Sequence, residues 1–398
     1  MSIGTPFDER TQPLNRKRQW REWSGYLAAS AYDHHHIHEY VGIRHAAVLI
    51  DVSPLYKYIV RGPDAVRLID RVITRDATKI KPGQVIYTPW CDEQGKVIDD
   101  GTIARLDDDD SFRWTSAEPH LRWFELNSRG LDVQVEDISE ATAAIALQGP
   151  LARDVLAVAT KADWSDLGFY RRRATRVGRI PIDVSRTGYT GDLGFELWVG
   201  ADKAVALWDR LMEVGRPFGV RPAGMLALDM ARLEAGLILI EVDYTSAKHA
   251  LIADQNYSPY EIGFGRLVNL DKPADFVGRR ALIAERDRGG PARRFVGLTI
   301  DYPSIESLYE AQDLPIAVST TTWREQRPIY ANGRQVGRAT SGTWSPTLKQ
   351  HIAVASVEPT YEPAGSRVAL EWTVEGRRGR AAATVVPLPF FDPPRKRA

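Results

Sequence analysis

The hydrophobic pattern of this chain changes near residue 290, and the change restricts the folds that the chain can adopt. Before this point, apolar stripes with helical spacing, as in residues 65–72, alternate with β-rich runs. Beyond it helical spacing is scarce, and short strand-like runs such as 295–300, 367–372 and 381–386 are separated by Gly and Pro. We therefore predict an α+β body followed by a small antiparallel β-barrel or sandwich. The charged residues 285–294 (ERDRGGPARR) are typical of an inter-domain linker.

Two β-hairpins are predicted within the body. Their strands are residues 85–91 with 97–106, and residues 180–186 with 195–199. The first pair flanks a DEQG turn, and the second flanks a glycine-rich loop. Helices are expected at about 201–215 and 222–235, and residues 1–30 are expected to be irregular or partly helical.

Composition excludes several classes of function. Lys plus Arg and Asp plus Glu both number 52, so no net basic charge favours a nucleic-acid partner. Cys91 is the single cysteine, which rules out an intramolecular disulfide and a cysteine-rich metal site. Residues 1–20 lack the apolar region of a signal peptide, and no run is long enough to span a bilayer. We expect a cytoplasmic protein with no membrane partner and no bound metal.

Two adjacent carboxylates, Asp99 and Asp100, occur at the start of the strand that follows the first turn. Neighbouring side chains on a strand point to opposite faces, so one of them can face solvent while the other points inward. An inward carboxylate needs hydrogen-bond donors or a cation, because an unpaired buried charge is very costly. The inward residue either satisfies nearby backbone N–H groups or serves a ligand, and its own spacing leaves both interpretations open.

The loop of the second hairpin (residues 186–196, RTGYTGDLGFE) is the other candidate binding element. Gly188 and Gly191 permit a tight turn and a close approach of a flat ligand to the backbone. Tyr189 offers a ring face, and Glu196 offers a bidentate acceptor for a flat heterocycle with an N–H edge, such as a pterin. An ordinary glycine-rich hairpin with a cross-strand tyrosine would show the same pattern.

Other motifs indicate structure rather than chemistry. Arg232 and Glu234 cannot face one another on a helix, so packing and a C-cap are favoured there. His34 and His38 would share a helical face, but no Glu or Cys motif accompanies them. Dinucleotide-binding, P-loop and serine-nucleophile signatures are missing from the sequence.

Several motifs occur in the order and spacing of one known family. In chain order they are residues 39–44 (EYVGIR), 50–53 (IDVS), 62–65 (GPDA), 81–84 (KPGQ), 95–100 (GKVIDD), 147–150 (LQGP), 186–196, 222–224 (PAG), 232–236 (RLEAG), 275–279 (DFVGR) and 337–348 (GRATSGTWSPTL). From about residue 35 almost to the end, the chain thus resembles the glycine cleavage T-protein family, whose prototype is an aminomethyltransferase. No single motif is specific, but their shared register is strong evidence.

The resemblance implies a three-domain cloverleaf around a central tetrahydrofolate channel. It divides the chain into an N-terminal arm (residues 1–34), a folate-binding α+β body of two interleaved subdomains (35–290) and a C-terminal antiparallel β-barrel domain (291–398).

The resemblance also implies roles for single residues. Asp100 occupies the place of the family's essential carboxylate, near N5 and N10 of the folate. Glu196 matches the pterin-binding acid, Tyr189 the aromatic residue beside it, and Tyr87 a residue that lines the pterin pocket.

The chain departs from the family's aminomethyltransferases on the side of the folate tail and the carbon donor. Ser116 replaces the usual Asn, and Leu228 replaces an Arg that helps to hold the folate tail. These two positions remain candidates for cofactor binding, with altered recognition of the tail. The loop at residues 241–249 (EVDYTSAKH) is longer than usual, and Phe390-Phe391-Asp392 replaces the C-terminal Tyr.

We therefore predict a folate-dependent demethylase, which moves a methyl or methylene group from an O-, N- or S-linked small molecule to N5 of tetrahydrofolate. Asp100 would orient the folate and stabilise developing charge. Tyr244, His249 and His120 are the candidate proton donors for the leaving group. Trp90, Trp114 and Trp344 are expected either to wall the donor or to lie in the core.

Two alternatives remain. One is an aminomethyltransferase, which would need a lipoyl carrier protein as partner. The more distant one is a non-catalytic folate-binding scaffold. That branch of the family resembles KGCYxGQE around a critical cysteine, whereas Cys91 lies in PWCD here, which argues against it.

Overall fold

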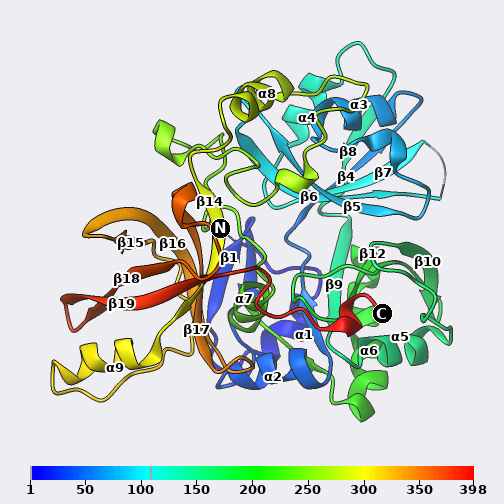
Figure 1. The fold of residues 1–398 in the computed structure, drawn as a ribbon. Helices are drawn as coiled ribbons and strands as arrows, with labels where there is room; N and C mark the ends of the chain where they lie inside the picture. Colours follow the sequence, from blue (N-terminus) through cyan, green and yellow to red (C-terminus); the bar gives the residue numbers. More distant parts are fainter. Residues whose placement is uncertain (1, 108–109) are drawn as a thin grey trace.

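The computed structural model describes residues 2–107 and 110–398, and Figure 1 shows these residues as an α+β fold with three lobes. Within them, the strands form two large sheets, a closed barrel and a short hairpin. The first sheet has the order β5 (Val85–Cys91), β6 (Val97–Arg105), β7 (Ser111–Ser116), β4 (Tyr56–Arg61) and β8 (Gln134–Asp137). The second has the order β10 (Arg172–Val177), β11 (Ile180–Ser185), β12 (Gly194–Gly200), β9 (Thr142–Gln148), β3 (Val48–Asp51) and β13 (Arg221–Pro222). Both expected hairpins, β5–β6 and β11–β12, are confirmed.

The first sheet is inserted into the second. Strands β3 and β9 are hydrogen-bonded neighbours, with Leu49 opposite Leu147, yet all the strands of the first sheet lie between them in the chain. Helices cover the sheets, and the longer ones bury an apolar face; in α3, for example, Leu68, Ile69 and Val72 are fully buried. The helices are α1 (Asp8–Thr11), α2 (Ile37–His45), α3 (Ala65–Val72), α4 (Leu121–Asn127), α5 (Ala152–Thr160), α6 (Ala204–Gly215), α7 (Met225–Glu234), α8 (Arg279–Asp287) and α9 (Tyr302–Glu310).

The last part of the chain closes into an antiparallel barrel, as the strand pattern predicts. Its order is β14 (Arg294–Ile300), β17 (Gln350–Val357), β16 (Arg334–Ser345), β15 (Arg327–Ala331), β18 (Arg367–Val374) and β19 (Arg377–Val386), and β14 pairs with β19 to close it. Helix α9, which the pattern does not predict, is capped by Asp301, whose side chain accepts a hydrogen bond from Ser304 N–H. Ile305 of this helix is fully buried in the barrel core.

The N-terminal residues are more ordered than expected. Besides α1, they form the hairpin β1 (Trp20–Trp23) and β2 (Tyr26–Ala29), and Phe7 is fully buried in the core of the second sheet. This anchor explains the order, because burying a phenylalanine offsets the entropy of fixing the segment around it. No helix among the described residues has the length and apolar character needed to cross a bilayer.

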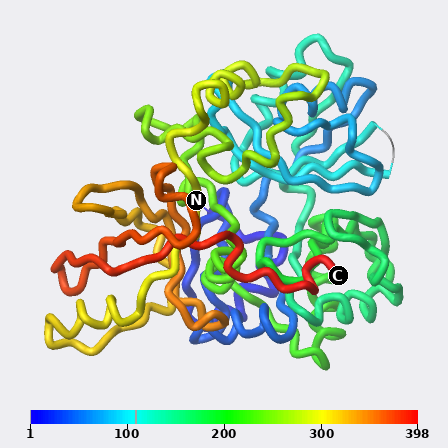
Figure 2. The backbone as a smooth tube through the Cα atoms, in the orientation of Figure 1, coloured from blue at the N-terminus to red at the C-terminus, as the bar shows by residue number. Residues whose placement is uncertain are grey.

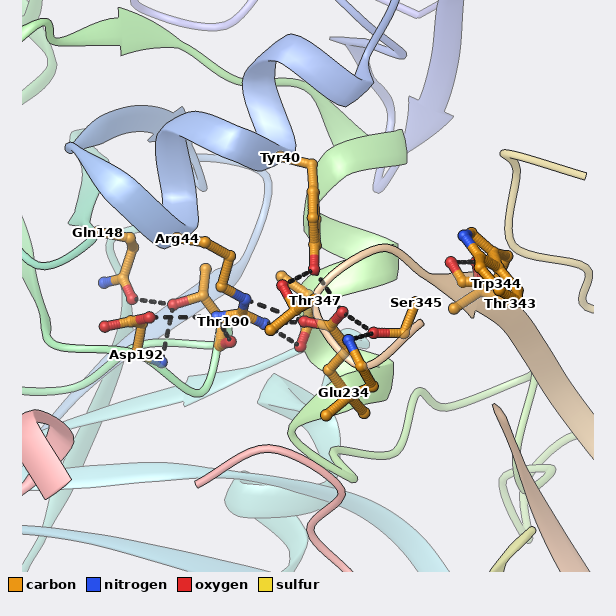
Figure 3. Close-up of polar contacts among 12 residues, drawn as sticks. Tyr40, Arg44, Gln148, Thr190, Asp192, Glu234, Thr343, Trp344, Ser345 and Thr347 are labelled. Atoms are coloured by element: carbon orange, nitrogen blue, oxygen red, sulfur yellow. Dashed lines mark hydrogen bonds and ion pairs between the residues drawn. The ribbon is translucent and has the colours of Figure 1, made fainter. Parts of the chain in front are cut away.

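Helix α7 lies where the lobes meet, and its last residue, Glu234, is the centre of a buried ion network (Figure 3). Arg44 of α2 donates to Glu234 Oε2 through Nη2 at 2.6 Å and through Nε at 2.9 Å. Arg44 also contacts Asp192, from the loop before β12, at 3.4 Å. Tyr40 of α2 and Ser345 of the barrel donate their hydroxyls to the other oxygen of Glu234.

The C-terminal residues join the same network. In Figure 2 the red end of the tube leaves the barrel and runs across to the second lobe. On the way, Phe391 N–H donates to the carbonyl of Glu234 at 2.8 Å, and Arg395 pairs with Asp192 at 2.7 Å. The barrel, the second lobe and the C-terminal segment are thus tied to one buried set of charges.

Replacement of Arg44 by Met is expected to lower the free energy of unfolding in urea by about 3–5 kcal/mol, because Glu234 then stays buried without its cation. The control is Arg210→Met, which breaks an exposed pair with Glu213 and should cost less than about 1 kcal/mol. Equal, small losses in both variants would show that the network does not stabilise the fold.

Candidate active site

Each carboxylate oxygen of Asp100, on β6, accepts a hydrogen bond from a tyrosine hydroxyl. Tyr87 of β5 donates to Oδ2, and Tyr244, from the loop after α7, donates to Oδ1 at 2.5 Å. The neighbouring residue, Gly101, lets β6 approach β7 closely, because a Cβ at this position would lie 2.0 Å from the carbonyl oxygen of Thr115. The first sheet and the 237–250 loop together therefore assemble the carboxylate predicted to be essential.

The surroundings of Asp100 bring its pKa close to physiological pH. Burial, and then the adjacent charge of Asp99, raise the pKa of Asp100 to about 7, while the hydrogen bonds from Tyr244 and Tyr87 act in the opposite direction. Burial raises the pKa of both tyrosines well above 10, so their hydroxyls remain neutral donors. A carboxyl group with a pKa near 7 inside a set of neutral donors suits proton transfer or charge stabilisation.

Asp99 points to the opposite face, as strand alternation requires. Asp99 is fully buried, because residues 116–120 cover its side of β6, whereas Asp100 beside Tyr244 is only partly buried. Asp99 accepts hydrogen bonds from Asp100 N–H at 2.7 Å and from Glu118 N–H at 3.0 Å. The inward carboxylate of the pair is therefore Asp99, and Asp100 is the more accessible one.

His120 lies behind Asp99, and no hydrogen bond joins its side chain to Asp100 among the described residues. Its Nε2 is 2.8 Å from Asp99 Oδ2, and its Nδ1 is 2.7 Å from Lys248 Nζ, so both ring nitrogens are engaged. Burial, and then the charge of Lys248, lower the pKa of His120 to about 2, so the ring is neutral. Its ring packs against Trp90 at a centroid distance of 5.2 Å.

His249 also lies away from Asp100. It is exposed and pairs with Glu241 at 3.1 Å. Of the three proton donors proposed from the sequence, only Tyr244 contacts Asp100.

Glu196 forms the second acidic element, on β12 of the second sheet. Thr187 donates to its Oε2 at 2.5 Å, and burial raises the pKa of Glu196. Among the described residues no hydrogen bond is found to its other oxygen, Oε1, so this oxygen is available to a ligand. Tyr189 donates its hydroxyl to the carbonyl of Ile238, which leaves its ring as the contact surface.

Tyr170 is a member of this region that the sequence patterns miss. It has a left-handed backbone with φ of +58°, which is strained for an aromatic residue, and strain of this kind gathers at functional sites. Burial, and then the charge of Glu196, raise the pKa of Tyr170 to about 12, whereas Arg75 acts in the opposite direction. Arg75 in turn donates to the carbonyl of Tyr87 at 3.1 Å. No local sequence pattern predicts a left-handed backbone at this tyrosine, so it could be identified only from the structure.

The two positions that depart from the family lie on either side of this region. Ser116, at the end of β7, is opposite Gly101 in the sheet and donates to the carbonyl of Glu118 at 2.8 Å. Leu228 of α7 is buried in an apolar cluster on which Tyr189 packs, and its side chain brings no polar atom.

The three tryptophans are placed differently from a substrate wall. Trp90 and Trp114 are fully buried and meet edge to face at 5.3 Å, so both belong to the core of the first lobe. Trp344 lies in the barrel against His351 at 4.9 Å.

Comparison with known proteins agrees with this architecture. The family model for the GCVT N-terminal domain matches residues 13–272, and the model for the glycine cleavage T-protein C-terminal barrel domain matches residues 315–392. The solved aminomethyltransferase T of the glycine cleavage system from Bartonella henselae superposes with a TM-score of 0.82 at 25% identity, covering 98% of this chain and 99% of that one. The chain therefore belongs to the glycine cleavage T-protein family.

Two relatives carry different activities in their names. An aminomethyltransferase of Moorella thermoacetica is 36% identical over 378 residues, which are 94% of each chain. A trimethylamine-oxide aldolase of Ruegeria pomeroyi is 35% identical over 376 residues, which cover 91% of this chain and 44% of that protein. Similar overall identity thus accompanies relatives with differently named activities.

Replacement of Tyr244 or of Tyr87 by Phe is expected to raise the pKa of Asp100 by roughly one unit, because each hydroxyl stabilises the ionised carboxylate. Carbon-13 NMR of aspartate-labelled protein, assigned by difference against Asp100→Asn, measures this shift. Tyr189→Phe is the matched control, since its hydroxyl bonds to Ile238 rather than to Asp100. An unchanged pKa in both of the first two variants would contradict the arrangement described here.

Proposed function

We propose that this protein is a tetrahydrofolate-dependent one-carbon transferase that demethylates a small O-, N- or S-methylated substrate. The observation that carries the proposal is the Tyr87–Asp100–Tyr244 cluster, in which one carboxylate holds two neutral hydroxyl donors. The Tyr244 hydroxyl comes from the long 241–249 loop, which departs from the family's aminomethyltransferases. Relatives named for trimethylamine-oxide cleavage as well as for aminomethyl transfer support a variable donor side on a shared scaffold.

The residues present fit a folate. The unpaired Oε1 of Glu196 can accept hydrogen bonds from the N–H edge of a pterin, and the ring of Tyr189 offers an apolar face beside it. When bound, tetrahydrofolate supplies the N5 nucleophile that takes the carbon, so that R–X–CH3 becomes R–XH without an external oxidant. Leu228, in place of an arginine, leaves the folate tail to be recognised by other groups.

The protein's own groups then contribute charge and protons. Ionised Asp100 stabilises positive charge that develops on the transferred carbon. The hydroxyl of Tyr244 lies beside Asp100 and can turn its proton toward the departing heteroatom of the donor. Glu196 and Tyr189 hold the acceptor in line, and this positioning supplies much of the acceleration.

The proposal is tested by incubating the protein with tetrahydrofolate and a panel of methoxyaromatics, methylamines and methylated sulfur compounds. Mass spectrometry of the folate product separates 5-methyl- from 5,10-methylene-tetrahydrofolate, so one measurement reports both activity and the oxidation level of the carbon. Asp100→Asn is expected to fold normally and to lose at least about 100-fold in turnover. Turnover without tetrahydrofolate, or full activity of Asp100→Asn, would refute the proposal.

Aminomethyl transfer is the second candidate, because the relative from Moorella thermoacetica with this name matches over nearly the whole of both chains. It requires a lipoylated carrier protein, and reconstitution of glycine cleavage with such a carrier decides between the two reactions.

Activity is expected to rise as the pH increases through about 7. Because the pKa of Asp100 is raised to about 7, its carboxylate is protonated below this pH, and the charge that assists transfer is lost. The measurement is the turnover number between pH 5.5 and 8.5, with product quantified by mass spectrometry. A turnover number that stays flat across this range would show that the ionisation of Asp100 does not control the reaction.

A further inference from the structure

A chain of hydrogen bonds runs from the protein surface to the backbone of Asp100. Lys248 Nζ lies 2.7 Å from His120 Nδ1, and His120 Nε2 lies 2.8 Å from Asp99 Oδ2. The other oxygen of Asp99 accepts the N–H of Asp100 at 2.7 Å. His120 and Asp99 are both buried, so these contacts are shielded from water.

The chemistry of Lys248 determines which atom donates and which accepts at each hydrogen bond of this series. An ammonium group only donates, so Nδ1 of the neutral His120 accepts from Lys248 and its Nε2–H donates to Asp99. Burial raises the pKa of Asp99 to about 7, while the N–H groups of Asp100 and Glu118 and the charge of Lys248 favour its ionised form. The ionised Asp99 places a negative charge directly behind Asp100.

Residues 244–248 contact Asp100 directly and are linked to Asp99 through His120. Tyr244 binds Asp100, and four residues later Lys248 reaches Asp99 through His120. Between them, Ser246 Oγ donates to the carbonyl of Ile98 at 2.6 Å, and Ala247 N–H donates to that of Val97 at 2.8 Å. Residues 244–248 are thus attached along β6 by side-chain and backbone bonds.

We propose that Asp99, His120 and Lys248 are positioning residues that lock the 244–248 segment onto β6 and set the charge behind Asp100, so that Tyr244 and Asp100 stand ready for transfer. This inference rests on the proposed function for its catalytic meaning, but its structural content can be tested alone. None of these three residues needs to touch the substrate, because each acts through Asp100 or Tyr244.

Titratable groups from several elements surround the two carboxylates. Asp100 is faced by Tyr87 from β5, Tyr244 from the loop, Tyr189 from the loop before β12, and Asp99 on its own strand. Asp99 is faced by His120, Lys248 and Glu118. Lys248 is the cation of this set, and its charge lowers the pKa of Asp99 against the larger, opposite effect of burial.

The first test removes the surface end of the chain with Lys248→Met. Hydrogen exchange of residues 241–249, measured by mass spectrometry with and without tetrahydrofolate, is expected to speed up at least tenfold. Lys248→Arg keeps a charged donor and is expected to restore slow exchange. Lys203→Met removes an exposed lysine that pairs only with Asp202 among the described residues, and it serves as the matched control. Unchanged exchange in Lys248→Met would overturn the proposal.

The second test removes the charge with Asp99→Asn, which keeps the shape of the side chain. Because the charge of Asp99 raises the pKa of Asp100, this pKa is expected to fall by about one unit in carbon-13 NMR. The rising limb of activity should move to lower pH by the same amount. An unmoved pKa in a folded Asp99→Asn protein would overturn the proposal, and should that variant not fold, the Lys248 series decides.

Activity adds a readout that separates the two proposals. With a donor found in the panel, Lys248→Met is expected to lower kcat about tenfold at nearly constant KM, and Lys248→Arg to restore it. If the wild-type protein yields no folate product, the proposed function fails, yet exchange and NMR still decide whether the chain positions Asp100 and Tyr244.

Discussion

The pairing of Arg44 with Glu234 is the interaction on which the rest of the structure depends. A guanidinium and a carboxylate taken out of water cost several kcal/mol each, and only close, multiple contacts offset that cost. Here the contacts come from α2 (Tyr40 and Arg44), from the barrel (Ser345) and from the loop before β12 in the second lobe (Asp192). The charges are therefore fully satisfied only when the barrel is docked on the second lobe. Helix α7, which carries Glu234, is held at the centre, and the loop that follows it delivers Tyr244 to Asp100.

The candidate site takes its acidic groups from two separate sheets. Asp100 belongs to the first sheet and Glu196 to the second, so the docking of the lobes sets the span that a ligand must bridge. The 244–248 segment then closes one side by bonding along β6. Chemistry near Asp100 is tuned by burial and by the charge of Asp99, whereas Glu196 keeps one oxygen free for recognition. Two carboxylates in two environments can thus perform two tasks.

The local patterns predict much of this, and the limits have physical reasons. Both hairpins and the C-terminal barrel follow from alternation and turn residues, which act over short distances. Arg232 and Glu234 do not face one another, as their spacing requires, but their buried ion pairs are not foreseen: Arg232 binds Asp229 and Asp243, while Glu234 binds Arg44. The link from Lys248 to His120 joins positions 128 residues apart, so no local pattern contains it. The strained backbone of Tyr170 arises from tertiary packing and leaves no trace in its neighbours.

The insertion of the first sheet between β3 and β9 has a consequence for the order of folding. Strand β3 pairs with β9, which follows the whole first lobe in the sequence. Such a distant pairing forms slowly, because a long loop must be closed first. A folded first lobe shortens that loop by bringing its two ends together. Folding of the lobe that carries Asp100 is thus expected to precede closure of the sheet that carries Glu196, and the candidate site, which needs both, is expected to form late.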